Sequence, residues 1–168
     1  VASVYNGNIS KEPIETDAYV EDSSAVSMMQ DDVSQILSKN IDVIKPISGT
    51  ITSLYGARDQ IFKGVNSYHT GLDIAAKAGT DVKSVCNGKV VKVQKMDKYY
   101  GNYVVVENNE VRFKYAHMKE IKVKLNDEIK QGHIVGTVGS TGMSTGPHLH
   151  LEISINSRTV DPQNIIKF

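Results

Sequence analysis

Apolar positions follow two different periods along the chain, and the change falls near residue 40. Between residues 24 and 39 they recur at i, i+4, i+7 and i+8, which predicts one amphipathic helix. The residues that carry this spacing are Met29, Val33, Ile36 and Leu37. Ser23 or Ser24 offers an N-cap, and Asn40 ends the pattern. Residues 1–22 are polar and aperiodic, so we expect them to form a tether.

From Ile47 onward the pattern is that of short strands. β-Branched runs alternate with glycines, and twelve of the thirteen Gly lie between Gly49 and Gly146. The pair Asn108-Asn109 between two such runs predicts a hairpin turn. Strand–helix–strand spacing does not occur, which argues against a doubly wound parallel sheet. We therefore expect a mainly β fold, an antiparallel sheet or sandwich, with one N-terminal helix. The expected strands are 49–54, 72–76, 82–86, 88–96, 102–107, 110–117, 120–125, 133–138 and 147–155.

Composition narrows the class of protein. The 168 residues are 40% hydrophobic and 23% charged, with a mean hydropathy of −0.27, as in a globular protein rather than a disordered or membrane-spanning one. The single Cys86 excludes an intramolecular disulfide and a thiolate-based zinc finger. Cys86 lies in an apolar run before a turn, so we expect it to be a buried small hydrophobe.

The net charge of zero hides an asymmetry. Residues 1–43 carry eight acids against two Lys, a net charge of −6, and residues 44–168 carry a net charge of +6. This split predicts an acidic lead-in (1–43) attached to a mildly basic domain (44–168). A solubilising linker beside a Lys-rich surface would explain the numbers, and so would a polyanionic partner. Nucleic acid is disfavoured because the Lys residues are scattered through strands without an Arg cluster. Bacterial cell wall, with its carboxylates and anionic polymers, fits as well.

His69 and Asp73 form a first pair of candidate metal ligands. In an extended strand the two residues would lie ~13 Å apart, too far to share one ion. The chain must therefore bend at Thr70-Gly71, and we expect Gly71 to permit the bend through its backbone freedom. An imidazole with a carboxylate suits zinc. Alone, this spacing is weak evidence, because it occurs by chance in many chains.

A second motif runs from Gly146 to Ile153. Strand alternation places His148, His150 and Glu152 on one face and the intervening Leu and Ile residues on the other, which must be the core. Two unpaired histidines in a core would be costly to desolvate, so the pattern favours a surface or metal-binding role. His117 ends a predicted strand, where a lone His is more often an ordinary surface residue. His133 has no partner motif, and we expect a solvent-exposed strand residue there.

Taken in order along the chain, these motifs resemble those of the M23 (LytM-type) peptidoglycan endopeptidases. The likeness covers roughly residues 47–166. It includes ITSLYGAR (51–58), YHTGLDIAA (68–76), GNYVVVE (101–107), GSTGMSTGPHLHLE (139–152) and Val160-Asp161-Pro162. The resemblance implies a LytM domain of the duplicated hybrid motif type, with a groove over an antiparallel sheet and the Gly139–Gly146 loop as one wall.

The resemblance also implies roles for individual residues. His69, Asp73 and His150 would be the three protein ligands of a Zn²⁺ ion, with the fourth position left to water. His117 and His148 would be the helper pair beside that water. Three N/O ligands with an open position suit hydrolytic zinc, whereas a fourth protein ligand closes a structural site. One helper imidazole would accept the water proton, and the other would stabilise the oxyanion or protonate the leaving amine.

Two functions from different classes are compatible with this pattern. The first is a zinc-dependent endopeptidase that hydrolyses peptide bonds of bacterial peptidoglycan. The second is a zinc-binding LytM-type interaction domain of a membrane-anchored cell-envelope or sporulation complex, which would act by binding a protein partner. Every ligand and helper position of the family pattern is filled, which favours catalysis.

The order of tether, helix and C-terminal domain also resembles the forespore-membrane Q components of spore-forming bacteria. Some clostridial versions of these proteins keep the full motif set. Because the chain begins with Val1 rather than Met, we expect an upstream signal peptide or membrane anchor. Both functions imply a domain outside the cytoplasm, either secreted, in the cell wall or anchored to the membrane.

Overall fold

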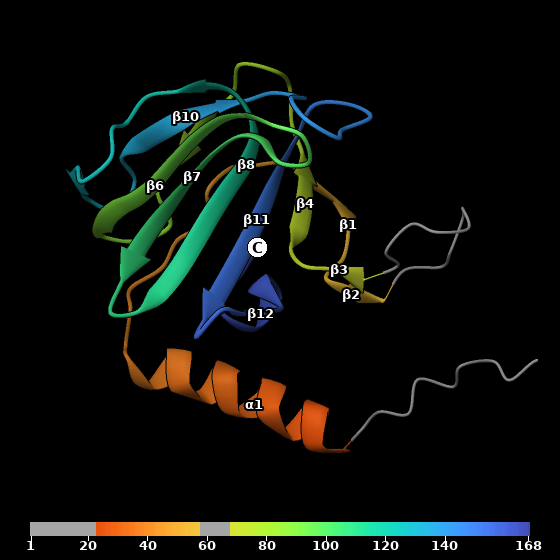
Figure 1. Ribbon diagram of the computed structural model, residues 1–168, viewed down its shortest axis with the longest axis vertical. Coiled ribbons are helices and arrows are strands. Elements are labelled where there is room, and N and C mark those ends of the chain that lie inside the picture. The colour runs from red at the N-terminus through yellow and green to blue at the C-terminus, as the bar shows by residue number, and fades with distance from the viewer. Residues whose placement is uncertain (1–22, 58–67) are drawn as a thin grey trace, which may run out of the picture.

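The computed structural model describes residues 23–57 and 68–168 (Figure 1). Its elements are α1 (Ser23–Ser38), β1 (Thr50–Ser53), β2 (Gly56–Ala57), β3 (Tyr68–His69), β4 (Leu72–Ala75), β5 (Asp81–Lys83), β6 (Gly88–Asp97), β7 (Gly101–Asn108), β8 (Val111–Ile121), β9 (Glu128–Ile129), β10 (Ile134–Val138), β11 (His148–Ile155), β12 (Arg158–Val160) and the 3-10 turn η1 (Pro162–Asn164). The expected mainly β fold with one N-terminal helix is confirmed for these residues. The expected tether at 1–22 lies outside them.

One antiparallel sheet carries nearly all of the strands. Its main path runs β1-β4-β11-β8-β7-β6-β9, with β10 on β5 and β8, and β12 on β11. β11 therefore lies near the middle of the sheet, between β4 and β8 (Figure 1). Its Leu149, Leu151 and Ile153 side chains are fully buried in the core, as the alternation predicts. The histidines of the same strand consequently point to the opposite face.

The expected separate strand at 120–125 is wrong. β8 continues without a break to Ile121, and a turn follows in which the Lys124 amide donates to the Asp127 carboxylate at 2.8 Å. Asn126 has a φ of 71°, a left-handed conformation that ends strand pairing. β2, β3, β9 and β12 are two or three residues long, too short for alternation to show in a sequence.

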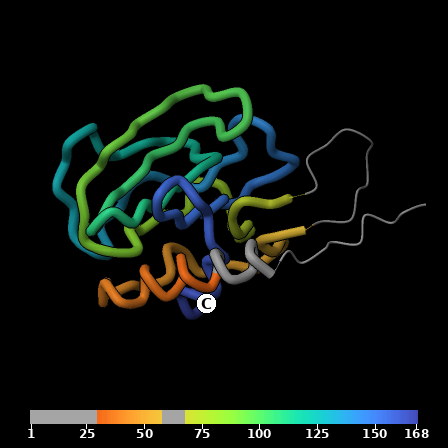
Figure 2. Tube along the Cα trace, turned by 60° about the horizontal axis from the view of Figure 1, so that its bottom comes forward, coloured from red at the N-terminus to blue at the C-terminus, as the bar shows by residue number. Residues whose placement is uncertain are grey.

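α1 packs against β12 at one end of the sheet rather than within it (Figures 1 and 2). Asp32 is only 2% exposed and accepts two hydrogen bonds from the Arg158 guanidinium, at 2.6 and 2.8 Å. Ile36 enters the main core, and Asn40 has a φ of 49° just beyond the end of the helix. No helix in the described ranges is long and apolar enough to cross a membrane. The division into 1–43 and 44–168 stays a proposal, with α1 docked on the second segment.

Cys86 and His133 lie in the environments that the sequence predicts for them. Cys86 is completely buried, as expected, and burial raises the pKa of its thiol to about 12. A thiol in this environment is inert as a nucleophile. His133 is exposed, as expected, although it lies just before β10 rather than within a strand.

Candidate metal centre

Three side chains from different elements converge at the β4–β11 pairing. His150 of β11 lies directly opposite Asp73 of β4, and the bend after β3 returns His69 to the same point. His150 Nδ1 lies 2.8 Å from Asp73 Oδ1. His69 Nε2 lies 3.1 Å from that oxygen and 3.1 Å from His150 Nδ1. The three atoms thus form a nearly equilateral triangle.

Gly71 is required at the bend for a different reason from the expected one. Its backbone does not adopt the left-handed conformation that favours glycine, so conformational freedom is not the requirement. Instead, a β-carbon at this position would lie 2.5 Å from the Leu151 carbonyl oxygen and 2.9 Å from Cε1 and Nε2 of His150. The bend between His69 and Asp73 packs directly onto the His150 ring, and only glycine leaves room for it.

Hydrogen bonds on the outer side of each imidazole define its tautomer. His69 Nδ1 lies 2.9 Å from the Leu54 carbonyl oxygen, which can only accept, so Nδ1 carries the proton. His150 Nε2 lies 2.9 Å from Glu152 Oε1 and donates to that carboxylate in the same way. The unprotonated Nε2 of His69 and Nδ1 of His150 therefore face each other and the Asp73 oxygen.

This donor set fits a zinc ion. Three acceptor atoms so close together need positive charge between them, and one divalent cation supplies it to all three at once. Tetrahedral zinc with bonds of about 2.0–2.1 Å would place its ligand atoms roughly 3.3 Å apart, close to the observed 2.8–3.1 Å. Within the described ranges, His69, Asp73 and His150 are the one cluster of this kind. No fourth His, Cys, Asp or Glu of the described residues joins this cluster.

The electrostatics of the centre favour a cation as well. Burial raises the pKa of Asp73, but the adjacent imidazoles of His150 and His69 outweigh it when they carry positive charge, and they leave that pKa well below its usual range. Burial also raises the pKa of Glu152, and the bonds from His150 and Thr70 reverse the effect and lower it to about 2. Both carboxylates are therefore ionised at neutral pH, one on each side of the His150 ring.

His117 and His148 lie beside this cluster. Their ring centroids are 4.7 Å apart, the His117 ring lies 5.8 Å from that of His150, and His148 Nε2 lies 3.7 Å from Asp73 Oδ1. His117 Nδ1 donates to the Thr141 carbonyl at 2.7 Å, and His148 Nδ1 donates to the Gly146 carbonyl at 2.8 Å. Both residues consequently have Nε2 free of the proton in the neutral state.

The backbone at His117 is unusual. Its φ is 60°, a left-handed conformation that is rare for a non-glycine residue and costly to hold. The register of β8 shifts next to this residue in its pairing with both neighbours, near Asn102 of β7 and near Val138 of β10. Burial lowers the pKa of His117, so its imidazole is neutral at pH 7. The strand is thus distorted where it presents this ring to the cluster.

The segment between β10 and β11 orients the rings of both of these histidines. It supplies the two carbonyl groups that accept from His117 and His148, and Ser144 Oγ lies 3.2 Å from His148 Nδ1. Thr141 anchors it, because its hydroxyl donates to the Met118 carbonyl and accepts from the Asn102 amide. These anchoring contacts come from backbone groups and small polar residues, so no residue pattern in the sequence indicates them.

Glu152 has more contacts than the sequence indicates. Besides His150, its Oε1 accepts from the Thr70 hydroxyl at 2.6 Å and the Tyr100 hydroxyl at 2.8 Å. Lys114 Nζ lies 3.2 Å from Oε2 and 4.0 Å from the centre of the Tyr100 ring. Alternation along β11 places Glu152 on the face of the histidines, but its other partners come from distant parts of the chain.

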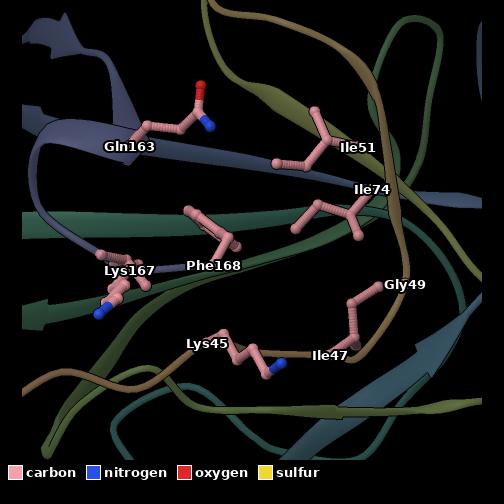
Figure 3. A pocket seen from close by; sticks show the side chains of 9 residues that line it. Lys45, Ile47, Gly49, Ile51, Ile74, Gln163, Lys167 and Phe168 are labelled. Carbon is pink, nitrogen blue, oxygen red and sulfur yellow. The ribbon is translucent and has the colours of Figure 1, made fainter.

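The pocket drawn in Figure 3 is not part of this centre. It has a volume of about 390 Å³ and lies between β1, β4 and the C-terminal residues, with Ile51, Ile74 and Phe168 among its lining side chains (Figure 3). It contains none of the five histidines and no carboxylate side chain. The candidate metal cluster is therefore identified by the chemistry of its side chains and not by this pocket.

Comparison with known proteins supports the same interpretation. The family model described as Peptidase family M23 matches residues 67–162. An uncharacterized metalloprotease of Buchnera aphidicola is 38% identical over 101 residues, which are 60% of this chain and 27% of that protein. The peptidoglycan DD-endopeptidase ShyB of Vibrio cholerae is 43% identical over 94 residues, which are 55% of this chain and 22% of that protein. The chain thus spans about a quarter of the length of these relatives.

Solved structures match over more of their length. The catalytic domain of the prophage-encoded M23 protein EnpA from Enterococcus faecalis superposes with a TM-score of 0.63 at 35% identity, over 71% of this chain and 95% of that domain. A zinc-containing peptidase from Vibrio cholerae gives a TM-score of 0.67 at 35% identity, over 72% of this chain and 39% of that protein.

Proposed function

Because the chain belongs to peptidase family M23, we propose that it is a zinc-dependent endopeptidase that hydrolyses peptide bonds of bacterial peptidoglycan. The observation that carries the proposal is the convergence of three acceptor atoms, one each from His69, Asp73 and His150, beside the paired rings of His117 and His148. Two relatives from Vibrio cholerae that are named peptidoglycan DD-endopeptidases support this substrate class.

In this proposal His69 Nε2, Asp73 Oδ1 and His150 Nδ1 hold the metal. A zinc ion bound there supplies Lewis-acid polarisation of the scissile carbonyl and lowers the pKa of a water molecule. The protein's own contribution is to fix the three ligand atoms before the metal arrives. The carbonyl of Leu54 and the carboxylate of Glu152 do so by holding protons on the outer nitrogens of the two imidazoles.

His117 and His148 are proposed to move protons. Each keeps its proton on Nδ1 through a bond to a backbone carbonyl, so each Nε2 is available as an acceptor toward the cluster. An imidazole that takes the proton of the attacking water at Nε2 can return it to the leaving amine. The partner imidazole, once protonated, can stabilise the negative charge that develops on the carbonyl oxygen.

The proposed substrate also determines where the protein acts. Peptidoglycan lies outside the cytoplasmic membrane, so we propose an extracytoplasmic location, with a signal peptide or membrane anchor upstream of the present chain. The net charge of +6 over residues 44–168 suits a surface that approaches an anionic wall. A protein partner in the envelope would be an addition to this activity rather than a replacement for it.

The test combines metal analysis with defined substrates. The purified chain should bind one zinc ion and cleave muropeptides, and chelation should abolish the cleavage until zinc is restored. Three substrates should be compared: directly cross-linked stem dimers, glycine-bridged dimers and uncross-linked stem peptides. Zinc binding without cleavage of any of the three would overturn the enzymatic proposal and favour the zinc-binding interaction domain.

A further inference from the structure

We propose that Glu152 is the positioning residue of the metal centre: its carboxylate fixes the tautomer and orientation of His150 so that the Nδ1 lone pair points at the metal. The inference rests on the proposed zinc-binding function of His69, Asp73 and His150. It assigns a role to a carboxylate outside that ligand set.

Glu152 cannot bind the same ion itself. Its Oε1 lies 2.9 Å from His150 Nε2, the nitrogen on the opposite edge of the ring from Nδ1. The imidazole therefore stands between the carboxylate and the cluster. A carboxylate bound to the outer nitrogen of a metal-ligating histidine holds the ring in place and makes its other nitrogen a stronger base. That is the geometry observed along β11.

Glu152 is held more firmly than an ordinary ion-pair partner. It is 5% exposed, and three donors converge on its Oε1: His150 Nε2, the Thr70 hydroxyl and the Tyr100 hydroxyl. Lys114 Nζ lies 3.2 Å from Oε2 and balances the buried charge. With donors on both oxygens, the carboxylate has little freedom to rotate away from the ring.

The other donors tie Glu152 to the rest of the centre. Thr70 follows the ligand His69 directly in the bend, so the bond from its hydroxyl links that bend to β11. Tyr100 accepts a hydrogen bond from the His117 amide at its carbonyl oxygen, at 2.8 Å. One carboxylate is therefore connected to the segment of one metal ligand, to the ring of another and to the backbone that carries His117.

The alternative role for Glu152 is purely structural, as the partner of the half-buried Lys114 in an ion pair. The two roles differ in what each substitution does. Glu152→Gln keeps the shape but replaces a charge-assisted hydrogen bond to His150 with a neutral one of about half the strength. Lys114→Gln removes the same ion pair and leaves the carboxylate against His150. Only the positioning role predicts that the first change weakens zinc binding and the second does not.

The experiment measures zinc affinity by competition with a chelating indicator, together with long-range ¹H–¹⁵N NMR spectra of the zinc-loaded protein. We expect Glu152→Gln to raise the Kd for zinc by about 10–100-fold. In the wild type, His150 should show a slowly exchanging Nε2 proton and coordination through Nδ1. In Glu152→Gln that proton should exchange faster and move upfield. Glu107→Gln, a matched change in an ion pair with Arg112 on the same sheet, should alter neither.

Three results would overturn the inference: an unchanged Kd and Nε2 proton in Glu152→Gln, an equal loss of affinity in Lys114→Gln, or coordination of His150 through Nε2. If Glu152→Gln does not fold, Thr70→Val offers a second route, because it removes the 2.6 Å donor and should speed exchange of the same proton. None of these measurements needs hydrolysis. A wild type that binds zinc without cleaving muropeptides would therefore refute the proposed activity and leave this inference standing.

Discussion

Gly71→Ala adds a single methyl group beneath the metal centre and removes no chemical group from it. The new β-carbon would lie 2.5 Å from the Leu151 carbonyl oxygen and 2.9 Å from two atoms of the His150 ring. Ordinary carbon–oxygen contacts begin at about 3.3 Å, so something must move by about 0.8 Å. Leu151 is paired with β4 on one side and β8 on the other, so residue 71 and its bend are expected to shift away from the Leu151 carbonyl. The His150 ring, 2.9 Å from the new β-carbon, is expected to turn away as well.

The size of that displacement predicts two separate losses. Overpacking of this kind costs about 1–3 kcal/mol of stability in the metal-free protein. Zinc ligands tolerate only about 0.2 Å of deviation in bond length, so a larger shift of the His150 ring should misdirect Nδ1. The same shift strains the 2.9 Å bond from Nε2 to Glu152. We therefore expect the Kd for zinc to rise by about 10-fold or more.

Gly88→Ala is the matched control. Its β-carbon would lie 2.5 Å from the Glu107 carbonyl oxygen and 2.8 Å from a methyl group of Val106, so the crowding is equal, but it faces none of the cluster. Urea unfolding in the presence of a chelator should show a similar loss of stability for both variants, and a zinc titration should show a loss of affinity for Gly71→Ala only. Wild-type zinc affinity in Gly71→Ala, or a parallel loss in both variants, would refute the steric argument.

Four further changes test other parts of the structure. His117→Ala should keep near-stoichiometric zinc and lower turnover by about 10²–10⁴-fold, whereas His69→Ala should lose zinc. Metal analysis and muropeptide kinetics check both variants. Equal zinc loss in the two would contradict the division of roles. Deletion of residues 1–22, which contain no His or Cys, should leave zinc content and hydrolysis unchanged. The hydrogen bond from Arg158 lowers the pKa of Asp32. The pair therefore stabilises the docking of α1 above the unfolded pKa of about 3.9, and this stabilisation is lost as the pH falls below that value through the folded pKa. Thermal melts of Arg158→Met should show a lower Tm than the wild type at pH 7 and a smaller further drop in acid.

The parts of the centre that depend on local pattern were predictable from the sequence. Alternation along 147–155 placed His148, His150 and Glu152 on one face, and β11 shows that arrangement with its leucines in the core. The need for a bend between His69 and Asp73 followed from the reach of an extended strand. Both inferences use only the geometry of a few consecutive residues, which is why a single sequence suffices for them.

What the sequence could not supply depends on contacts between distant segments. The tautomer of His69 is decided by the carbonyl of Leu54, and that of His150 by a carboxylate that Tyr100 and Lys114 cover. Backbone carbonyls leave no mark on the residue pattern, and the covering side chains come from 38 to 52 positions away along the chain. For the same reason, the sequence predicted that Gly71 is needed for its backbone freedom, whereas the structure shows that the His150 ring leaves no room for a side chain there.

The proposed metal ligands and the proposed helper histidines are held in place by different parts of the fold. The ligand atoms of Asp73 and His150 lie on two strands whose pairing places them opposite each other. The helper pair, His117 and His148, is oriented instead by carbonyl groups of the irregular segment between β10 and β11. A displacement of that segment would release both helper rings and leave the strand pairing intact. We therefore expect the proposed metal binding and the proposed proton transfer to be separable by mutation, and comparison of His69→Ala with His117→Ala measures this.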